Sequence, residues 1–149
     1  MLNIIYFAGM RSKLLIGFLF LHFFYACSDD NNKPGSDTDV DAARSFIRFA
    51  LDGDYKNASK FIIQDSLNLQ YLQAFSSNYD NRMTPEDKRG YRASSINIHG
   101  IRQVNDSVTV VNYSNSFKKA KDSLKVIRQQ GQWQVDLKYS FDHNNVPLQ

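Results

Sequence analysis

The chain opens with a long apolar stretch and continues with a polar region in which apolar residues recur at regular intervals. Between residues 38 and 79, apolar side chains recur three and four positions apart, as at Ala43, Phe46 and Ile47. This spacing places them on one face of a helix. From about residue 94 the period changes to two, which is typical of strands. The pattern therefore predicts helices first and a sheet afterwards.

Capping residues mark where the predicted helices begin and end. Thr38 with Asp41 resembles a capping box, in which a hydroxyl and a carboxylate satisfy the first free amides. Gly53 can end this helix in the left-handed conformation, and Asp54 can cap the next helix at once. Later helices are expected to begin at Asp65-Ser66, with Leu69, Leu72 and Phe75 facing inward, and at Thr84-Pro85.

Four strands are predicted after residue 94. The first three contain Ile96 with Ile98, residues 106 to 117, and Leu124 with Val126. Within the second, the apolar residues switch parity between Val110 and Val111, which indicates either burial on both faces or a β-bulge. Turns are expected at three breaks in the pattern, namely Asn105-Asp106, Lys121-Asp122 and Gln130-Gly131. We therefore expect an antiparallel meander.

The fourth strand has the clearest alternation. Its apolar residues, each preceded by a polar one, are Trp133, Val135, Leu137, Tyr139 and Phe141. One face of this strand is therefore expected to meet the core and the other to meet water. Asp136 falls on the water-facing side.

Helices followed by four antiparallel strands predict an α+β domain with N-terminal helices packed on the sheet. Two short motifs add a family resemblance: ALDGDY, at Ala50 to Tyr55, lies between two helices, and GQWQV, at Gly131 to Val135, opens the last strand. Together they resemble the nuclear-transport-factor-like (cystatin-like) α+β roll, and more narrowly its branch of small exported lipoproteins of unknown function. The resemblance covers residues 39 to 141. It implies a fold and no chemistry, because this fold hosts isomerases, dehydratases, ligand binders and interaction modules.

The first 26 residues differ from the rest in composition. Nineteen of them are apolar, against 44 of the 123 that follow. Arg11 and Lys13 are their only charges and precede an uncharged run, Leu14 to Tyr25, which reaches about 18 Å as a helix. Because a bilayer core is ~30 Å thick, we expect a cleaved signal peptide and not a spanning helix. Met10 is an alternative start, since it places the charges near the N-terminus.

The signal ends in a motif that resembles the lipobox of bacterial lipoproteins. Phe24-Tyr25-Ala26-Cys27 matches the aromatic-tolerant form common in Bacteroidetes, with Phe24 where leucine is commonest. The resemblance implies cleavage between Ala26 and Cys27, diacylglycerol on the Cys27 sulfur and an acyl chain such as palmitate on the new amine. Two or three chains make a stable anchor where one is marginal. The alternative is a free thiol, because a single cysteine excludes a disulfide framework within the chain.

Ser28-Asp29-Asp30 resembles the export tag that sends some Bacteroidetes lipoproteins to the outer face of the outer membrane; the alternative is a solvated acidic tether. We therefore expect a lipid-anchored outer-membrane protein at the cell surface, with the periplasmic face as the alternative. The expected organisation is a signal peptide over 1–26, a lipidated cysteine and flexible acidic linker over 27–38, the roll over 39–142 and a tail over 143–149.

Residues for catalysis are scarce. His99 lies on a predicted strand, where a pocket acid/base with Tyr113 or Tyr71 as neighbour is the alternative to an ordinary solvated histidine. The residues that we expect near a pocket are His99, Tyr113, Trp133 and Tyr139. The sequence has no metal-ligand spacing, dinucleotide fingerprint, phosphate loop or nucleophile elbow. We therefore expect no metal, no cofactor and no enzymatic activity.

Two further features concern modification and charge. Three Asp-Ser-apolar sequences resemble O-glycosylation sites of Bacteroidetes and would place sugars on Ser66, Ser107 and Ser123, although Asp-Ser also starts helices and strands. A basic cluster lies at Lys118, Lys119 and Lys121. We interpret it as a solvated turn that protects a sheet edge. The alternative is a patch that contacts phosphates or anionic lipid. Without the leader the net charge falls from +3 to +1, so nucleic acid is not an expected partner.

These features together favour a lipid-anchored, non-catalytic module that binds a small ligand, a peptide or a partner protein. One alternative is an enzyme, of isomerase or hydrolase type, that uses the cone between sheet and helices. Another is a structural subunit of an envelope complex that forms a homodimer through its sheet face.

Overall fold

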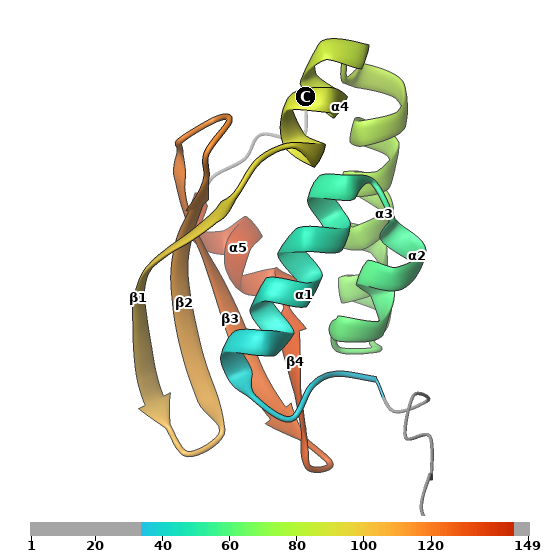
Figure 1. Cartoon of the computed structure of the whole chain (residues 1–149). Helices are drawn as coiled ribbons and strands as arrows, with labels where there is room; N and C mark the ends of the chain where they lie inside the picture. The colour runs from blue at the N-terminus through green and yellow to red at the C-terminus, as the bar shows by residue number, and fades with distance from the viewer. Residues whose placement is uncertain (1–33, 145–149) are drawn as a thin grey trace, which may run out of the picture. The chain divides into compact units, whose positions relative to one another are not determined.

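The helices of the domain lie on one side of a four-stranded sheet (Figure 1). The structure is a computed structural model and describes residues 34–144. Its elements in chain order are α1 (Asp39–Asp52), α2 (Tyr55–Ala58), the 3-10 helix η1 (Ser59–Phe61), α3 (Ser66–Arg82), α4 (Pro85–Arg92), β1 (Ile96–Asn105), β2 (Val108–Asn115), β3 (Lys121–Gln129), β4 (Gln132–Asp136) and α5 (Leu137–Asn144). The predicted α+β class, with helices followed by four antiparallel strands, is confirmed.

The helices begin at the predicted capping residues, whose side chains accept a backbone N–H from three residues later. The bonds run to Thr38 from Asp41 (3.1 Å), to Asp54 from Asn57 (3.0 Å), to Asp65 from Asn68 (2.8 Å) and to Thr84 from Asp87 (3.1 Å). Gly53 ends α1 at φ 77°, a left-handed conformation that glycine adopts without strain. The sequence therefore predicted these helix boundaries correctly.

The strands pair antiparallel in the order β1-β2-β3-β4. Val110 and Val111 are both buried, and β2 pairs with β3 without a register shift. Of the two explanations for the change of parity in β2, burial on both faces is therefore correct. Val111 faces the helices, whereas Val110 faces the other side, where it lies opposite Arg102 of β1 and Lys125 of β3. Long side chains beside it cover a residue that no helix of the described chain covers.

The hydrophobic core fills the space between the sheet and the helices. Its buried members include Ala43, Phe46, Ile47 and Leu51 of α1, Leu72 of α3, Val111 of β2, Leu124 and Val126 of β3, Trp133 and Val135 of β4, and Leu137 of α5. Partly buried aromatic side chains, among them Phe49, Phe61, Phe75 and Tyr91, pack against this cluster. Apolar side chains thus fill most of the interior between sheet and helices, together with buried polar ones such as Asn68 and Thr109.

The inner face of α3 differs from the prediction by one residue. Leu72 is buried as expected, but Leu69 is 43% exposed. The buried residues Asn68, Leu72 and Tyr79 define the inner face, and Leu69 does not lie on that stripe. The sequence pattern did not identify Asn68, because a polar residue was not expected in the interior.

The predicted fourth strand is correct as far as Asp136 and wrong beyond it. β4 ends at Asp136, and Leu137 begins α5, so that Tyr139 lies in a helix. The backbone N–H of Leu137 donates to the side chain of Asn68 at 2.7 Å. The expectation of a water-facing side is also wrong, because Asp136 is only 6% exposed and Gln134 is buried.

A strap formed by residues 34–38 covers the free edge of β4. Ser36 and Trp133 exchange two backbone hydrogen bonds, of 3.0 Å and 2.8 Å. The side chain of Gln134 donates to the carbonyl oxygen of Pro34 at 3.3 Å, which accounts for the burial of this polar residue. These strap residues, expected in the linker, are therefore held against the sheet. Pairing of this kind protects an edge strand from other chains.

The connection between β2 and β3 lies earlier than predicted. Lys121 and Asp122, expected in a turn, are the first residues of β3, and the turn occupies residues 116–120. Asn115 fixes this position, because its side chain accepts the N–H of Lys118 at 2.8 Å and its carbonyl oxygen accepts the N–H of Lys119 at 2.9 Å. The shift places Lys121 on the sheet.

Candidate functional site

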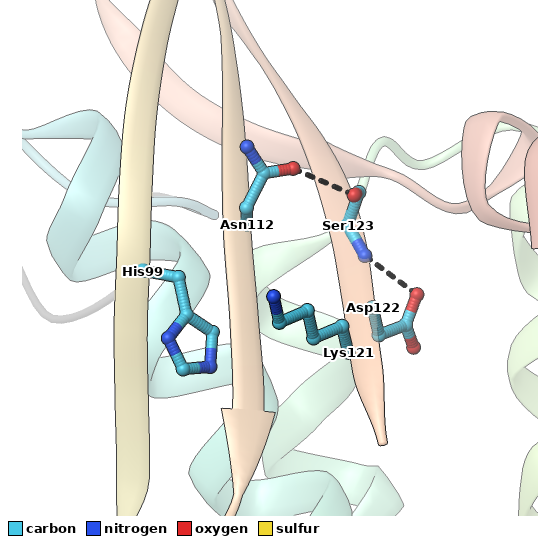
Figure 2. A pocket seen from close by; sticks show the side chains of 5 residues that line it. All are labelled: His99, Asn112, Lys121, Asp122 and Ser123. Carbon is cyan, nitrogen blue, oxygen red and sulfur yellow. Dashed lines mark hydrogen bonds between the residues drawn. The ribbon is translucent and has the colours of Figure 1, made fainter. Parts of the chain in front are cut away.

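A pocket of about 390 Å³ opens on the sheet, lined by His99, Asn112, Lys121, Asp122 and Ser123 (Figure 2). Val111 and Leu124 belong to the core on the helix side. Because successive side chains of a strand point to opposite faces, Asn112 and Ser123 point away from the helices. The pocket therefore lies on the face that the helices of the described chain leave uncovered.

Strand register brings these residues together from three parts of the chain. Asn112 of β2 lies opposite Ser123 of β3 and Gly100 of β1. The register of β1 shifts between Ile98 and Gly100, so His99 is the extra residue of a bulge. A bulge re-aims a side chain, and the His99 ring places Nε2 2.8 Å from Oγ of Ser114 on β2.

The oxygen acceptors of the pocket are engaged by the protein itself. Oδ1 of Asp122 accepts the backbone N–H of Ser123 at 2.6 Å, and Oδ2 accepts the phenol of Tyr113 at 3.1 Å. Oδ1 of Asn112 accepts the hydroxyl of Ser123 at 2.7 Å. In Figure 2 the carboxylate of Asp122 points away from His99 and Lys121. Little acceptor capacity is therefore left facing the pocket.

Two nitrogen donors of the pocket have no such partners. Among the side chains described, those of residues 34–140, the ammonium of Lys121 makes no hydrogen bond or ion pair, and Nδ2 of Asn112 makes no hydrogen bond. Figure 2 shows the Lys121 side chain extending from β3 toward β2, with His99 beyond it on β1. The second ring nitrogen of His99 likewise has no partner in the described part of the chain. The pocket thus presents one cation, one amide donor and a histidine ring nitrogen, which donates when Nε2 accepts the Ser114 hydroxyl.

Tyr113 lies opposite Asp122 in the pairing of β2 with β3, so the two side chains meet on the helix side of the sheet, away from the pocket. Burial, followed by the nearby Asp122 carboxylate, raises the pKa of the Tyr113 phenol well above its ordinary value. The phenol therefore stays protonated at neutral pH and donates to the carboxylate. This hydrogen bond directs the charge of Asp122 toward Tyr113 and away from Lys121.

The arrangement of His99 and Ser114 resembles a base beside a hydroxyl but lacks the remaining parts of a nucleophilic site. A nucleophile needs exposure and a base oriented by a third group. Ser114 is buried, and the neighbouring carboxylate of Asp122 is bound by Tyr113 and Ser123. Ser114, His99 and Asp122 therefore do not form a nucleophile–base–carboxylate arrangement.

The four residues predicted near a pocket do not come together. His99 lines the pocket on the uncovered face of the sheet. Trp133 is buried in the core on the helix side, and Tyr113 packs against the core on that same helix side. Tyr139 is partly buried in α5. Asn112 and Asp122 were not predicted as pocket residues, Ser123 was predicted as an O-glycosylation site, and Lys121 was predicted in a turn. The available signal was that Asn112 and Ser114 alternate with apolar or aromatic residues.

The remaining predicted sites are distributed along the chain. Ser66 is exposed at the first turn of α3, Ser107 is exposed between β1 and β2, and Ser123 lines the pocket. Residues of the predicted lipobox and export tag, namely Ala26, Cys27, Ser28, Asp29 and Asp30, lie outside the described residues. In the basic cluster, Lys118 pairs with Asp87 of α4 at 3.2 Å and lies over the rings of Tyr91 and Phe117.

The described residues contain neither a candidate metal site nor a candidate membrane span. Within residues 34–144, no group of three His, Cys, Asp or Glu side chains is placed to hold a metal ion. In the same part of the chain, no helix has the length and apolar character to cross a membrane.

The sequence matches no protein-family model, and neither the curated proteins nor the solved structures include a significant match.

Proposed function

We propose that the chain is a lipid-anchored lipoprotein of the cell envelope whose domain is a non-catalytic binding module. The pocket on the uncovered sheet face carries the binding part of this proposal, because its donors have no partner within the described protein. A buried or enclosed donor without a partner is costly, whereas a donor that faces a pocket is available to a ligand. The lipobox-like sequence ending at Cys27 carries the anchoring part.

We further propose that the domain is a nuclear-transport-factor-like roll. The order of helices and antiparallel strands supports this assignment, together with the ALDGDY motif, which forms the junction between α1 and α2. In such a roll, catalysis needs polar groups in the cone between sheet and helices. Here that space contains Phe46, Trp133 and Leu137, among other core residues, which supports a non-catalytic module.

The anchoring proposal is tested in cells with the Cys27→Ala variant. Wild-type protein should incorporate labelled palmitate and fractionate with the outer membrane, and the variant should lose the label and accumulate as uncleaved precursor. Protease treatment of intact cells then separates surface display, which we propose, from the periplasmic alternative. Labelling that is unchanged in the variant would contradict the lipid anchor.

The binding proposal is tested with the full-length protein in mild detergent. Amide signals of Asn112 and Ser123 should shift on titration with a panel of small polar molecules and short peptides, and the shifts should saturate. Shifts confined to residues remote from these two would contradict a site at this pocket.

A second candidate, a subunit that dimerises through its sheet, is favoured by the exposed edge strand. On β1 the apolar side chains of Ile101 and Val104 are 54% and 50% exposed, and β1 has a neighbour on one side only. Exposed apolar edge strands pair readily with another copy. Sedimentation of the full-length protein at increasing concentration tests this candidate, since a monomer throughout would exclude it.

A further inference from the structure

We propose that the pocket on the uncovered sheet face binds a small soluble molecule through an anionic group, a carboxylate or a phosphate. This inference rests on the proposed function, because it assumes that the pocket is a binding site, and it adds the chemical class of the ligand. The pocket is lined by His99, Asn112, Lys121, Asp122 and Ser123.

The balance of donors and acceptors determines the class of ligand. Asp122 and the oxygen of Asn112 are already bonded within the protein, to Tyr113 and Ser123. The groups left for a ligand are the ammonium of Lys121, the amide nitrogen of Asn112 and a ring nitrogen of His99. An anionic group that accepts hydrogen bonds pairs with the ammonium and the amide, and with the ring nitrogen of His99 in the tautomer that carries the proton there. Carboxylate and phosphate oxygens have this property.

Charge supports the same class. Lys121 makes no ion pair within residues 34–144, unlike Lys118, Lys125 and Lys138, which each lie within 4.0 Å of a carboxylate. Its one adjacent carboxylate, on Asp122, is directed toward the phenol of Tyr113. The positive charge of Lys121 is therefore not compensated locally. A ligand anion bound beside Lys121, whose side chain is exposed, would compensate this charge.

The size of the pocket favours a small molecule. Ligand pockets commonly have volumes of about 300 to 1,000 Å³, and this pocket, at about 390 Å³, lies near the lower limit. His99, Asn112 and Lys121 all line this pocket, and its volume admits one anionic group with a few further heavy atoms. A long polymer would require a groove that extends along the sheet.

The position of the pocket favours a soluble anion over a lipid headgroup. The strap that leads from the predicted anchor pairs with Trp133, which lies opposite Arg128 near the far end of β3. Lys121 is the first residue of β3, and seven residues of strand separate it from Arg128 by about 23 Å. The pocket is thus at the end of the sheet remote from the strap.

The experiment is a titration of the full-length protein, isotope-labelled and held in mild detergent, followed by NMR at constant ionic strength. Inorganic phosphate and citrate are the anionic probes, and glucose is the uncharged probe. We expect saturable shifts at Asn112, Lys121 and Ser123 with the anions and none with glucose. Lys121→Met and Asn112→Asp should each weaken phosphate binding at least tenfold, because one removes the cation and the other replaces a donor by a carboxylate.

A matched control and three outcomes make the test decisive. Lys56→Met removes an exposed lysine from α2, and should bind phosphate as the wild type does. Equal phosphate affinity of the wild type and Lys121→Met would overturn the anion site. If glucose binds saturably and neither anion does, the anion class is overturned but the binding module stands. If none of the three probes saturates, the anion class is overturned as well.

Vesicles distinguish the two sources of the anion. If the ligand is soluble, phosphatidylglycerol vesicles should shift the NMR signals of Asn112 and Ser123 no more than phosphatidylcholine vesicles do. Shifts at these two residues with phosphatidylglycerol alone, displaced by free phosphate, would overturn the soluble source and assign the site to a headgroup.

Discussion

The side-chain oxygen of Asn68 accepts the backbone N–H of Leu137 at 2.7 Å, across 69 positions of the chain. Asn68 is fully buried, and its amide nitrogen donates to Asp65 at 3.0 Å. Leu137 is the first residue of α5, where a backbone N–H has no partner within its own helix. The Asn68 side chain therefore joins the start of α3 to the start of α5 and satisfies a buried donor at the end of β4.

Asn68→Ala should destabilise the domain by at least ~1–3 kcal/mol, since it leaves the N–H of Leu137 buried without a partner. Chemical denaturation measures the loss. Asn81→Ala is the control, because Asn81 lies exposed on the same helix and bonds only to Ser77. Equal losses in the two variants would show that the Asn68–Leu137 bond contributes nothing specific.

The Asn68–Leu137 hydrogen bond illustrates which parts of the fold could be predicted from the sequence and which could not. Caps such as Thr38 and Gly53 act on their own neighbours, so the local sequence was sufficient to place them. The alternation through Tyr139 is genuine, but local period cannot show that Leu137 has a partner on α3. A tertiary hydrogen bond and the capping of Lys138 N by Asp136 at 3.3 Å favour a helix there.

Asp65→Asn should reveal a pH-dependent contribution to stability. A hydrogen bond from the backbone of Asn68, and then one from Lys138, lower the pKa of Asp65 from 3.8 to about 2. Because the folded-state pKa is depressed, the ionised group stabilises the fold above about pH 4, and this stabilisation is lost as the pH falls toward 2. Asparagine is an equally good N-cap, so the start of α3 is retained.

The measurement for Asp65 is urea denaturation of wild type and variant between pH 2 and pH 7. The difference in unfolding free energy should be largest near neutral pH and should shrink below pH 4. Lys138→Met removes the partner that lies 2.7 Å from Asp65 and should reduce this pH dependence. A difference that stays constant down to pH 2 would contradict the assignment.

Gly53→Ala should destabilise the domain more than Gly131→Ala. Both glycines have positive φ, 77° and 83°, so each alanine incurs backbone strain of about 1–3 kcal/mol. A Cβ at Gly53 would also lie 2.6 Å from Cζ of Tyr79, whereas a Cβ at Gly131 meets no atom within 4 Å. Thermal denaturation should therefore separate the steric effect from the conformational effect. Equal losses would mean that the Tyr79 ring moves aside without cost.

Thr109→Val should stabilise the domain by about 1 kcal/mol. Thr109 is fully buried, and its hydroxyl has no hydrogen-bond partner in the described chain. Valine has nearly the same shape and removes the cost of burying an unpaired polar group. The reverse change in the same strand, Val111→Thr, should destabilise by about 1–3 kcal/mol. Chemical denaturation of both variants provides the check, and a less stable Thr109→Val would show that the hydroxyl has a partner in solution.

The candidate site was less predictable than the fold, because it depends on register. His99 was recognised from its residue type, but its direction depends on a bulge next to Gly100. Lys121 was assigned to a turn, and only the pairing of β2 with β3 places it beside Asn112. Residue types along one strand cannot reveal which residues of the next strand lie opposite.

Tyr113→Phe should weaken phosphate binding severalfold without any change in the pocket lining. The phenol of Tyr113 donates to Asp122 at 3.1 Å and holds that carboxylate away from Lys121. Removing the phenol takes away one of the hydrogen bonds that hold the Asp122 carboxylate, so its charge competes more strongly with an added anion for Lys121. Tyr55→Phe, which removes a phenol from α2, is the control and should leave phosphate affinity unchanged. The measurement is the NMR titration with phosphate. Equal phosphate affinity of wild type and Tyr113→Phe would show that Asp122 does not compete for Lys121. Weaker phosphate binding in Tyr113→Phe alone would establish Tyr113 as a positioning residue of the site.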